Sequence, residues 1–178
     1  RFAARFHSAI ESQTWESIFE SAPHLTRLSP ERVKQEIEKT MDQVRLPSRA
    51  FRLWRDSGAL AVLIPPLGGI SDVQLEALDH LRIPGLPGRP QRKIARLIGL
   101  FAAGQPRTVQ ETLKALRFSN ADVKWITSVV TTWNELSPVM TMTLTEELGP
   151  ADVDLRRWAA IAGRTRLASV LRLADAMW

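Results

Sequence analysis

The sequence predicts an all-α protein, built as an array of short helices. Nearly every segment repeats its apolar residues with a period of about 3.6, and almost none shows the period-two alternation of a half-buried strand. Residues that begin helices, such as Ser and Pro, and residues that end them, such as Gly, recur at short intervals. With 178 residues, of which 44% are hydrophobic, the chain suits one large domain or two small ones.

The first predicted helix begins with the chain itself. The spacing of Phe2, Phe6 and Ile10 places three apolar side chains on one helical face. We expect this helix to run to about Ser21 and to stop before Pro23, because proline removes a backbone donor. Neither an initiator Met nor a capping residue precedes this spacing, so we expect the chain to be a piece of a longer polypeptide.

The second predicted helix has a clear start. Ser29 offers its hydroxyl as an N-cap, and Pro30 takes the first helical position, where its missing N–H costs nothing. Val33, Ile37 and Met41 then form an apolar stripe. The sequence therefore predicts an amphipathic helix from Pro30 onward.

A third helix is predicted to start at Pro47 and to end at Gly58, which can adopt the left-handed conformation of a helix stop. Phe51 and Trp54 lie on one of its faces. The apolar run over residues 59–64 predicts a short buried helix that two prolines end.

Pro and Gly are dense in the middle of the chain, which marks the best candidate boundary. Within this stretch we expect a short helix that Ser71 caps and that runs through Leu81. The chain is therefore predicted to divide into residues 1–66, a linker-rich connection over residues 67–90, and residues 91–178.

The second half continues the helical pattern, beginning with a helix over residues 91–103. Thr108 and Glu111 have the spacing of a capping box, and Ser119 with Asp122 imitates it with a shorter acid. Further helices are predicted at about residues 109–117, 120–134, 143–148, 151–162 and 166–178, separated by Ser137-Pro138, Gly149-Pro150 and Gly163.

No arrangement typical of a catalytic or metal site is evident. The three His are scattered, and His80 has no partners at the spacing of metal ligands. Asp152 and Asp154 form an Asp-x-Asp pattern, but they are expected to open a helix, where acidic residues favour the helix dipole. We therefore predict no catalytic residue, no metal site and no cofactor in this chain.

Composition points away from a membrane. The apolar runs fall far short of the roughly 20 residues that span a bilayer. The chain has no Cys, which agrees with a reducing compartment. We expect no membrane association and a cytoplasmic location.

Basic charge is concentrated in one part of the chain. The net charge is +5, and residues 89–117 hold seven basic residues against one acidic residue. Such a cluster is typical of surfaces that bind nucleic-acid phosphates. The candidate binding residues are Arg89, Arg92, Lys93, Arg96, Arg107, Lys114 and Arg117.

The first four of these residues lie three or four apart, so they predict one exposed basic ridge on the helix over residues 91–103. The opposite, inward face would carry Ile94, Leu97, Ile98 and Phe101. The alternative is a solvated face whose long side chains cover apolar surface. The six Trp residues lie among apolar neighbours, which favours core packing over base stacking.

Several short motifs appear together in the first third of the chain. They are Arg1-Phe2-Ala3-Ala4-Arg5-Phe6, Leu28-Ser29-Pro30-Glu31-Arg32 with Glu36, Ser48-Arg49-Ala50-Phe51 and Gly58-Ala59-Leu60. In order and spacing, residues 1–64 resemble bacterial tRNA nucleotidyltransferases, the CCA-adding and poly(A) polymerase-like enzymes. Beyond Pro66 the resemblance thins to a basic helix and the stretch over residues 113–119.

This resemblance implies a neck, body and tail arrangement. Residues 1–66 would be a neck that positions RNA and primer, and residues 91–178 a body and tail that bind the acceptor stem and upper half of tRNA. The family's catalytic head has a Gly-Ser turn followed by Asp-x-Asp for metals, and its neck has an Asp-x-x-Arg-like motif that selects the incoming nucleotide; neither has a counterpart here. The resemblance therefore places the chemistry, with Mg²⁺, CTP and ATP, in a preceding N-terminal catalytic domain of the same polypeptide.

The resemblance also implies a structural motif in the neck. The family's Glu-Arg-x-x-x-Glu helix start buttresses the neck, and the matching positions are Glu31, Arg32 and Glu36. A carboxylate one turn after an Arg would fix its guanidinium fork. The alternative for these residues is an ordinary exposed ion pair.

Two other functions stay open at the level of sequence. A poly(A) polymerase of the same family would share this architecture. A helical interaction module without an enzymatic role would use the basic residues to meet an acidic protein partner.

Overall fold

The computed structural model describes residues 1–81, 92–147 and 149–178, with only the backbone of Arg92. In these ranges the chain forms α-helices and two short 3₁₀ helices and no strand, which confirms the all-α prediction. The helices are α1 Phe2–Phe6, α2 Ser12–Ser21, α3 Pro30–Gln43, α4 Pro47–Asp56, α5 Ala59–Leu63, α6 Asp72–His80, α7 Arg92–Phe101, α8 Pro106–Ala115, α9 Asn120–Thr145 and α10 Asp152–Met177, with 3₁₀ helices η1 Ala22–Arg27 and η2 Pro65–Leu67.

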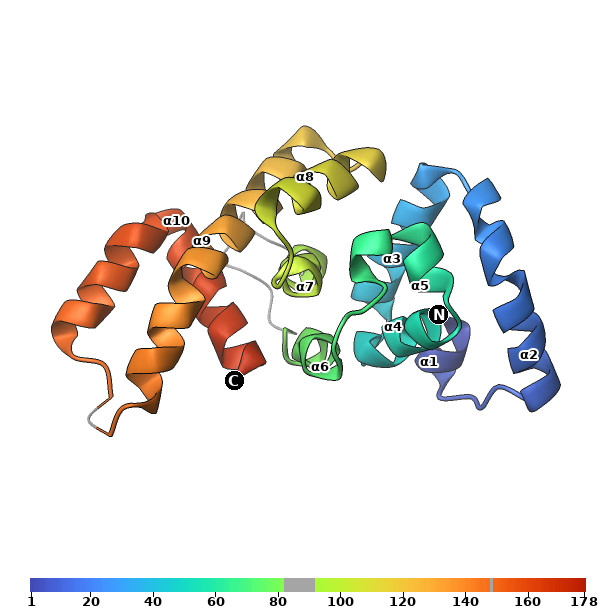
Figure 1. Cartoon of the computed structure of the whole chain (residues 1–178), viewed down its shortest axis with the longest axis horizontal. Coiled ribbons are helices and arrows are strands. Elements are labelled where there is room, and N and C mark those ends of the chain that lie inside the picture. Colours follow the sequence, from blue (N-terminus) through green and yellow to red (C-terminus); the bar gives the residue numbers. More distant parts are fainter. Residues whose placement is uncertain (82–91, 148) are drawn as a thin grey trace.

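The helices form an elongated arc (Figure 1). One end holds α1 to α5, with α2 outermost, and the other end is the hairpin of α9 and α10. Helices α6 and α7 lie in the middle, and α8 lies above them in this view. Segments far apart in the sequence therefore meet around α7.

The predicted long first helix is wrong, because the chain turns after α1. His7 takes a left-handed backbone conformation with a φ of 55°, and a new helix begins at Ser12. The Arg49 side chain, from α4, lies 2.6 Å from His7 Nδ1 and holds the turn in place. The predicted end at about Ser21 is confirmed, since α2 stops at Ser21 and Pro23 lies in the first turn of the 3₁₀ helix η1.

The predicted starts of the next helices are confirmed. The Ser29 hydroxyl accepts from the Arg32 N–H at 3.4 Å, and the Ser71 hydroxyl accepts from the Gln74 N–H at 3.2 Å. Gly58, with a φ of 77°, separates α4 from the short helix α5 as predicted. Local sequence was sufficient here because each start depends on one capping side chain.

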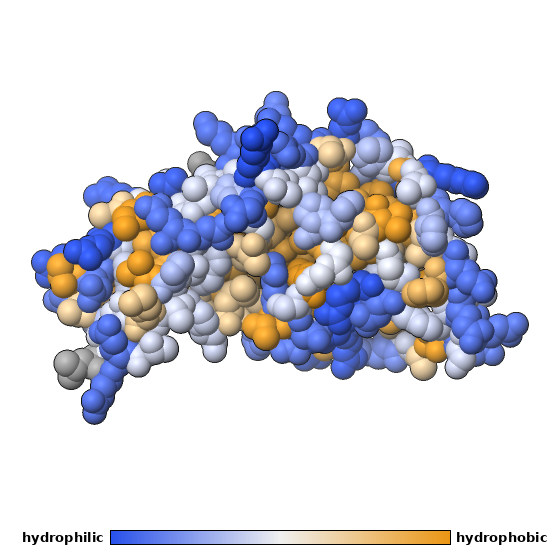
Figure 2. All heavy atoms as spheres, viewed as in Figure 1, coloured by the Kyte–Doolittle hydropathy of each residue, from blue (hydrophilic) through white to orange (hydrophobic). Residues whose placement is uncertain are grey.

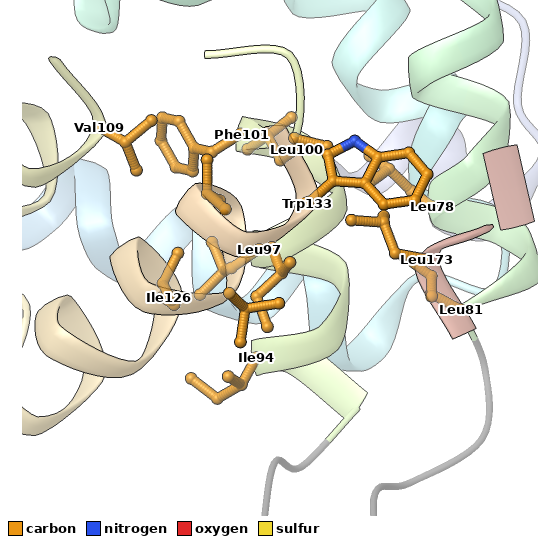
Figure 3. Close-up of a cluster of buried hydrophobic side chains, with 14 of the residues drawn as sticks. Leu78, Leu81, Ile94, Leu97, Leu100, Phe101, Val109, Ile126, Trp133 and Leu173 are labelled. Atoms are coloured by element: carbon orange, nitrogen blue, oxygen red, sulfur yellow. The ribbon is translucent and has the colours of Figure 1, made fainter. Parts of the chain in front are cut away.

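Side chains from α3 to α10 share one apolar cluster. The inward residues predicted on α7, Ile94, Leu97, Ile98 and Phe101, all belong to it. Figure 3 shows some of them beside Trp133 of α9 and Leu173 of α10. The cluster also includes Leu75 and Leu78 of α6, so this part of the predicted linker over residues 67–90 packs with both halves of the chain. Residues 82–91 lie outside the described residues, and the division into domains stays a prediction.

One buried arginine joins three helices. The Arg96 side chain of α7 is 1% exposed and donates to carbonyls near the ends of α3 and α6. Its acceptors are the carbonyl oxygens of Leu78 at 3.0 Å, Val44 at 3.1 Å, Arg45 at 3.3 Å and Met41. The last carbonyls of a helix lack partners within it and carry partial negative charge, so the guanidinium satisfies both helix ends at once.

Two predicted boundaries in the second half are wrong. Helix α8 begins at Pro106, so Thr108 lies in its first turn and does not cap it, while Glu111 pairs with Arg107 at 3.0 Å. Helix α9 continues through Pro138 to Thr145. Tertiary packing outweighs the proline there, because Leu136 and Met140 on either side of it are buried in the core.

Other predictions for this half are confirmed. The Ser119 hydroxyl accepts from the Asp122 N–H at 3.1 Å and donates to its carboxylate at 2.7 Å. Asp152 and Asp154 open α10, where Asp154 accepts from the Ala151 N–H at 3.1 Å. Gly163 interrupts α10 with a φ of 68° and a ψ of 159°, as its position in the sequence predicted. In the described ranges no helix has the combination of length and apolarity needed to cross a membrane.

Candidate nucleic-acid interface

The described part of the basic ridge predicted on α7, Lys93 and Arg96, is not an exposed surface. Arg89 lies outside the described residues, and only the backbone of Arg92 is described. Lys93 is partly buried and donates to Glu38 at 3.0 Å. The prediction of an exposed Arg96 is wrong, because its side chain lies inside the core. The physical reason is that α7 packs against α3, α6, α9 and α10, so it has no solvated face beyond its first turn.

The other three predicted residues are exposed, on and just after α8. Arg107 and Lys114 lie two helical turns apart on one side of the helix. The Arg107 side chain is 89% exposed and that of Arg117 70%. Their contact with RNA stays a prediction.

Lys34 of α3 joins this region and was not predicted. Its Nζ donates to the Arg117 carbonyl at 3.3 Å and lies 5.1 Å from the centre of the Phe118 ring. We call Lys34, Arg107, Lys114 and Arg117 the basic surface. Figure 2 shows hydrophilic side chains projecting over the region that α8 occupies in Figure 1. No local signal marks Lys34, because its place here depends on the packing of α3 beside the turn after α8.

Two acidic side chains lie within the basic surface. Glu111 pairs with Arg107, and Glu31 lies 3.9 Å from Arg117. Both carboxylates are solvent-exposed, so each pair is weak and can be exchanged for a pair with phosphate. The surface therefore keeps an excess of positive charge that is open to solvent.

The motif of Glu31, Arg32 and Glu36 does not form the predicted internal pair. Glu36 accepts from Arg1 Nε at 2.8 Å and from Lys39 at 3.4 Å. In the described part of the chain the exposed Arg32 side chain has no ion pair or hydrogen bond. Glu36 thus ties α3 to the start of the chain, and Arg1 supplies the cation that the sequence assigned to Arg32.

The environment of Glu36 shifts its titration. Partial burial opposes ionisation, but the hydrogen bonds and positive charges of Arg1 and Lys39 outweigh it and hold the pKa of this carboxyl below its ordinary value. Glu36 is therefore ionised at neutral pH and is already engaged by two cations.

A groove opens beside Arg32, between η1, α3, α4 and α5. Its volume is about 470 Å³, and all its lining residues fall between Leu25 and Leu63. They include Leu28, Arg32, Glu36, Lys39, Trp54 and Leu63, and we call it the Trp54 groove. In Figure 2, apolar surface is exposed over the region of α5.

Trp54 forms part of the groove wall from a fixed position. It is half-buried and packs against Phe51, with ring centres 5.2 Å apart and planes inclined by 59°. The sequence favoured core packing for the Trp residues. For Trp54 the structure shows both core packing and a place in the groove wall.

A metal centre is not found in the described ranges, where no three His, Cys, Asp or Glu residues lie together in a way that could hold an ion. Asp152 and Asp154 serve the start of α10, as described above.

Comparison with known proteins relates the first part of the chain to RNA-binding proteins. Residues 9–68 match the family described as "Probable RNA and SrmB- binding site of polymerase A". The multifunctional CCA protein of Cupriavidus taiwanensis is 43% identical over 83 residues, which are 45% of this chain and 20% of that protein. The multifunctional CCA protein of Janthinobacterium sp. is 40% identical over 86 residues, 47% of this chain and 20% of that protein.

The chain spans about a fifth of the length of these curated relatives. The matched segment over residues 9–68 contains Lys34 of the basic surface and every residue that lines the Trp54 groove. Residues 9–68 are therefore similar to a probable RNA-binding site of polymerase A, and about half of the chain is similar to part of the multifunctional CCA proteins.

Proposed function

We propose that this chain is the tRNA-binding helical portion of a tRNA nucleotidyltransferase that adds CCA, or part of it, to tRNA 3′ ends. The observation that carries the proposal is the match of residues 9–68 to a region described as a probable RNA-binding site, since these residues build the Trp54 groove and contribute Lys34 to the basic surface. The similarity to multifunctional CCA proteins supports tRNA as the RNA.

The proposed mode of binding follows from the charge and the nature of duplex RNA. An A-form helix has a deep, narrow major groove that side chains cannot read, so proteins recognise it mostly by its shape and through phosphates and 2′-hydroxyls. Lys34, Arg107, Lys114 and Arg117 present cations from two elements that are distant in sequence. We propose that this basic surface holds phosphates of the acceptor stem and upper half of the tRNA.

Within this proposal the described residues position the RNA and do no chemistry. A catalytic domain earlier in the same polypeptide would take CTP and ATP with Mg²⁺, which supplies charge stabilisation at the transferred phosphate. The protein would then act in the cytoplasm, where its tRNA substrate is processed.

A poly(A) polymerase is the second candidate, because the family description names polymerase A. The two functions differ in product, so the protein that carries this chain should be given tRNA without its CCA end, together with CTP and ATP. Sequencing the 3′ ends would show C and A additions for the first function and runs of A for the second.

A helical module that binds a protein is the third candidate, because the same description also names SrmB. The basic surface would then meet acidic side chains. RNA binding discriminates between these functions, since only the first two require it.

The direct test is a titration of labelled tRNA with this chain at several salt concentrations. We expect binding at about 50 mM salt and a steep loss of affinity by about 200 mM, because each phosphate contact releases a counterion. Absence of binding at about 50 mM salt would overturn the proposal.

A further inference from the structure

We infer that the Trp54 groove binds one unpaired nucleotide of the RNA, with its base against Trp54 and its phosphate at Arg32. This inference rests on the proposed function, because it assumes that the chain binds RNA. It adds a second kind of contact to the basic surface, one that a fully paired duplex cannot make.

The size and walls of the groove fit a nucleotide. Its volume of about 470 Å³ lies within the range of small-ligand sites. Leu28, Ala59 and Leu63 supply apolar walls. A base is a flat group with apolar faces, so such walls cover it better than they cover a phosphate backbone.

Trp54 provides the aromatic platform. Phe51, which is fully buried, holds the indole in position from behind. Because the side chain is already ordered by this packing, little rotamer freedom is lost when a base stacks on it. Stacking on an aromatic side chain is also tolerant of base identity, since every base has a π-face.

The charged groups of the groove favour an anion. Arg32 projects from the same wall of α3 as Lys39, and within the described part of the chain its guanidinium has no ion pair or hydrogen bond. The only carboxylate among the lining residues is Glu36, whose charge Arg1 and Lys39 already balance. A phosphate at Arg32 would therefore form a charge-assisted contact without meeting an unbalanced acid.

A protein segment is the competing occupant. The apolar surface continues past Leu25, Leu28 and Leu63 into a neighbouring pocket of about 250 Å³ that a side chain could fill. The nucleotide is favoured because an available guanidinium and an indole meet in one groove, and the whole groove lies in the segment matched to RNA binding.

The test compares two RNA hairpins with the sequence of a tRNA acceptor stem. One ends in a fully paired, blunt stem, and the other carries four unpaired 3′ nucleotides. Affinities are measured by fluorescence anisotropy at about 50 mM salt. We expect the wild-type chain to bind the overhanging hairpin about tenfold more tightly, the usual scale of one stacking contact.

Three variants test whether the Trp54 groove is the source of the higher affinity for the overhanging hairpin. Arg32→Ala and Trp54→Leu should each remove most of the tenfold preference and leave the affinity for the blunt hairpin nearly unchanged. Arg156→Ala is the matched control, because Arg156 is an 80% exposed arginine of α10 outside the groove. Melting curves check that each variant is folded. If Trp54→Leu does not fold, Arg32→Ala alone decides the test.

The outcomes separate the groove from the basic surface. Equal binding of both hairpins by the wild-type chain would overturn the nucleotide site and leave RNA binding intact, which is also the result expected if the groove takes a protein segment. A preference that survives Arg32→Ala would overturn the site as well. Failure of both hairpins to bind would instead remove the proposed function.

Discussion

At the scale of the residue, two arginines exchange the roles that sequence assigned to them. Arg96 was predicted on an exposed ridge and is 1% exposed, whereas Arg32 was predicted to be held in place and is exposed. Helical spacing alone could not show that Arg96 is buried and that Arg32 is exposed. It places a side chain on a face of its own helix but does not show how many neighbours surround that helix.

Replacing Arg96 should strongly destabilise the protein. Arg96→Met leaves the carbonyls near the ends of α3 and α6 without donors, and we expect a loss of about 3 kcal/mol in the free energy of unfolding. Urea unfolding measures it, with Arg156→Met as the exposed control that should change stability by less than about 0.5 kcal/mol. A loss below about 1 kcal/mol for Arg96→Met would contradict the structural role.

Glu36 should make part of the stability depend on pH. Its pKa is lowered in the folded protein, so its contribution is complete above the unfolded value of about 4.3 and disappears as the pH falls through the folded value. Glu36→Gln should therefore cost about 0.5 kcal/mol at pH 7, a small value because the carboxylate is 43% exposed. Unfolding at pH 7, 5, 4 and 3 should show the two proteins converge toward pH 3, and a constant difference would refute this.

At the scale of the element, the sequence correctly predicted the helix starts that depend on one capping side chain. Ser29, Ser71 and Ser119 cap as their spacing indicated, and Gly163 breaks α10. Sequence failed where tertiary packing decides the boundary. Pro138 does not end α9, because buried residues continue on both sides of it.

Replacing the two predicted capping residues of the second half, Thr108 and Ser119, should change the stability of the protein by different amounts. Ser119→Ala removes the acceptor for the Asp122 N–H and should cost about 1 kcal/mol of stability. Thr108→Ala should change it by less than about 0.5 kcal/mol, since Thr108 lies inside the first turn of α8. Thermal unfolding of both variants measures the difference, and equal losses would show that the assigned start of α8 is wrong.

The break in α10 should require glycine. Gly163 has a φ of 68° and a ψ of 159°, a region that almost only glycine occupies, so Gly163→Ala should cost about 1–3 kcal/mol. Gly69→Ala is the control, because its φ lies outside the positive region and a Cβ there would meet open space. A Gly163→Ala variant as stable as the control would mean that the two parts of α10 form one continuous helix.

At the scale of the whole molecule, the packing of the helices decides where charge is exposed. The sequence places the basic excess between residues 89 and 117. Among the described side chains of this range, those of α7 beyond its first turn are enclosed by neighbouring helices, and the exposed basic residues lie on and just after α8. Lys34 joins these exposed residues from 83 residues away. Neither this juxtaposition nor the Trp54 groove could be predicted, because both are made by elements that meet only in the folded chain.

The most direct test of RNA binding reverses the charge of the basic surface. The triple variant Arg107→Glu, Lys114→Glu and Arg117→Glu is compared with the matched variant Arg156→Glu, Arg157→Glu and Arg164→Glu, which makes the same change in net charge at exposed positions of α10. The measurement is the affinity for tRNA as a function of salt. The account predicts that only the first variant loses affinity by more than about tenfold and shows a salt slope lower by about two to three. Equal losses in both variants, or none in the first, would contradict it.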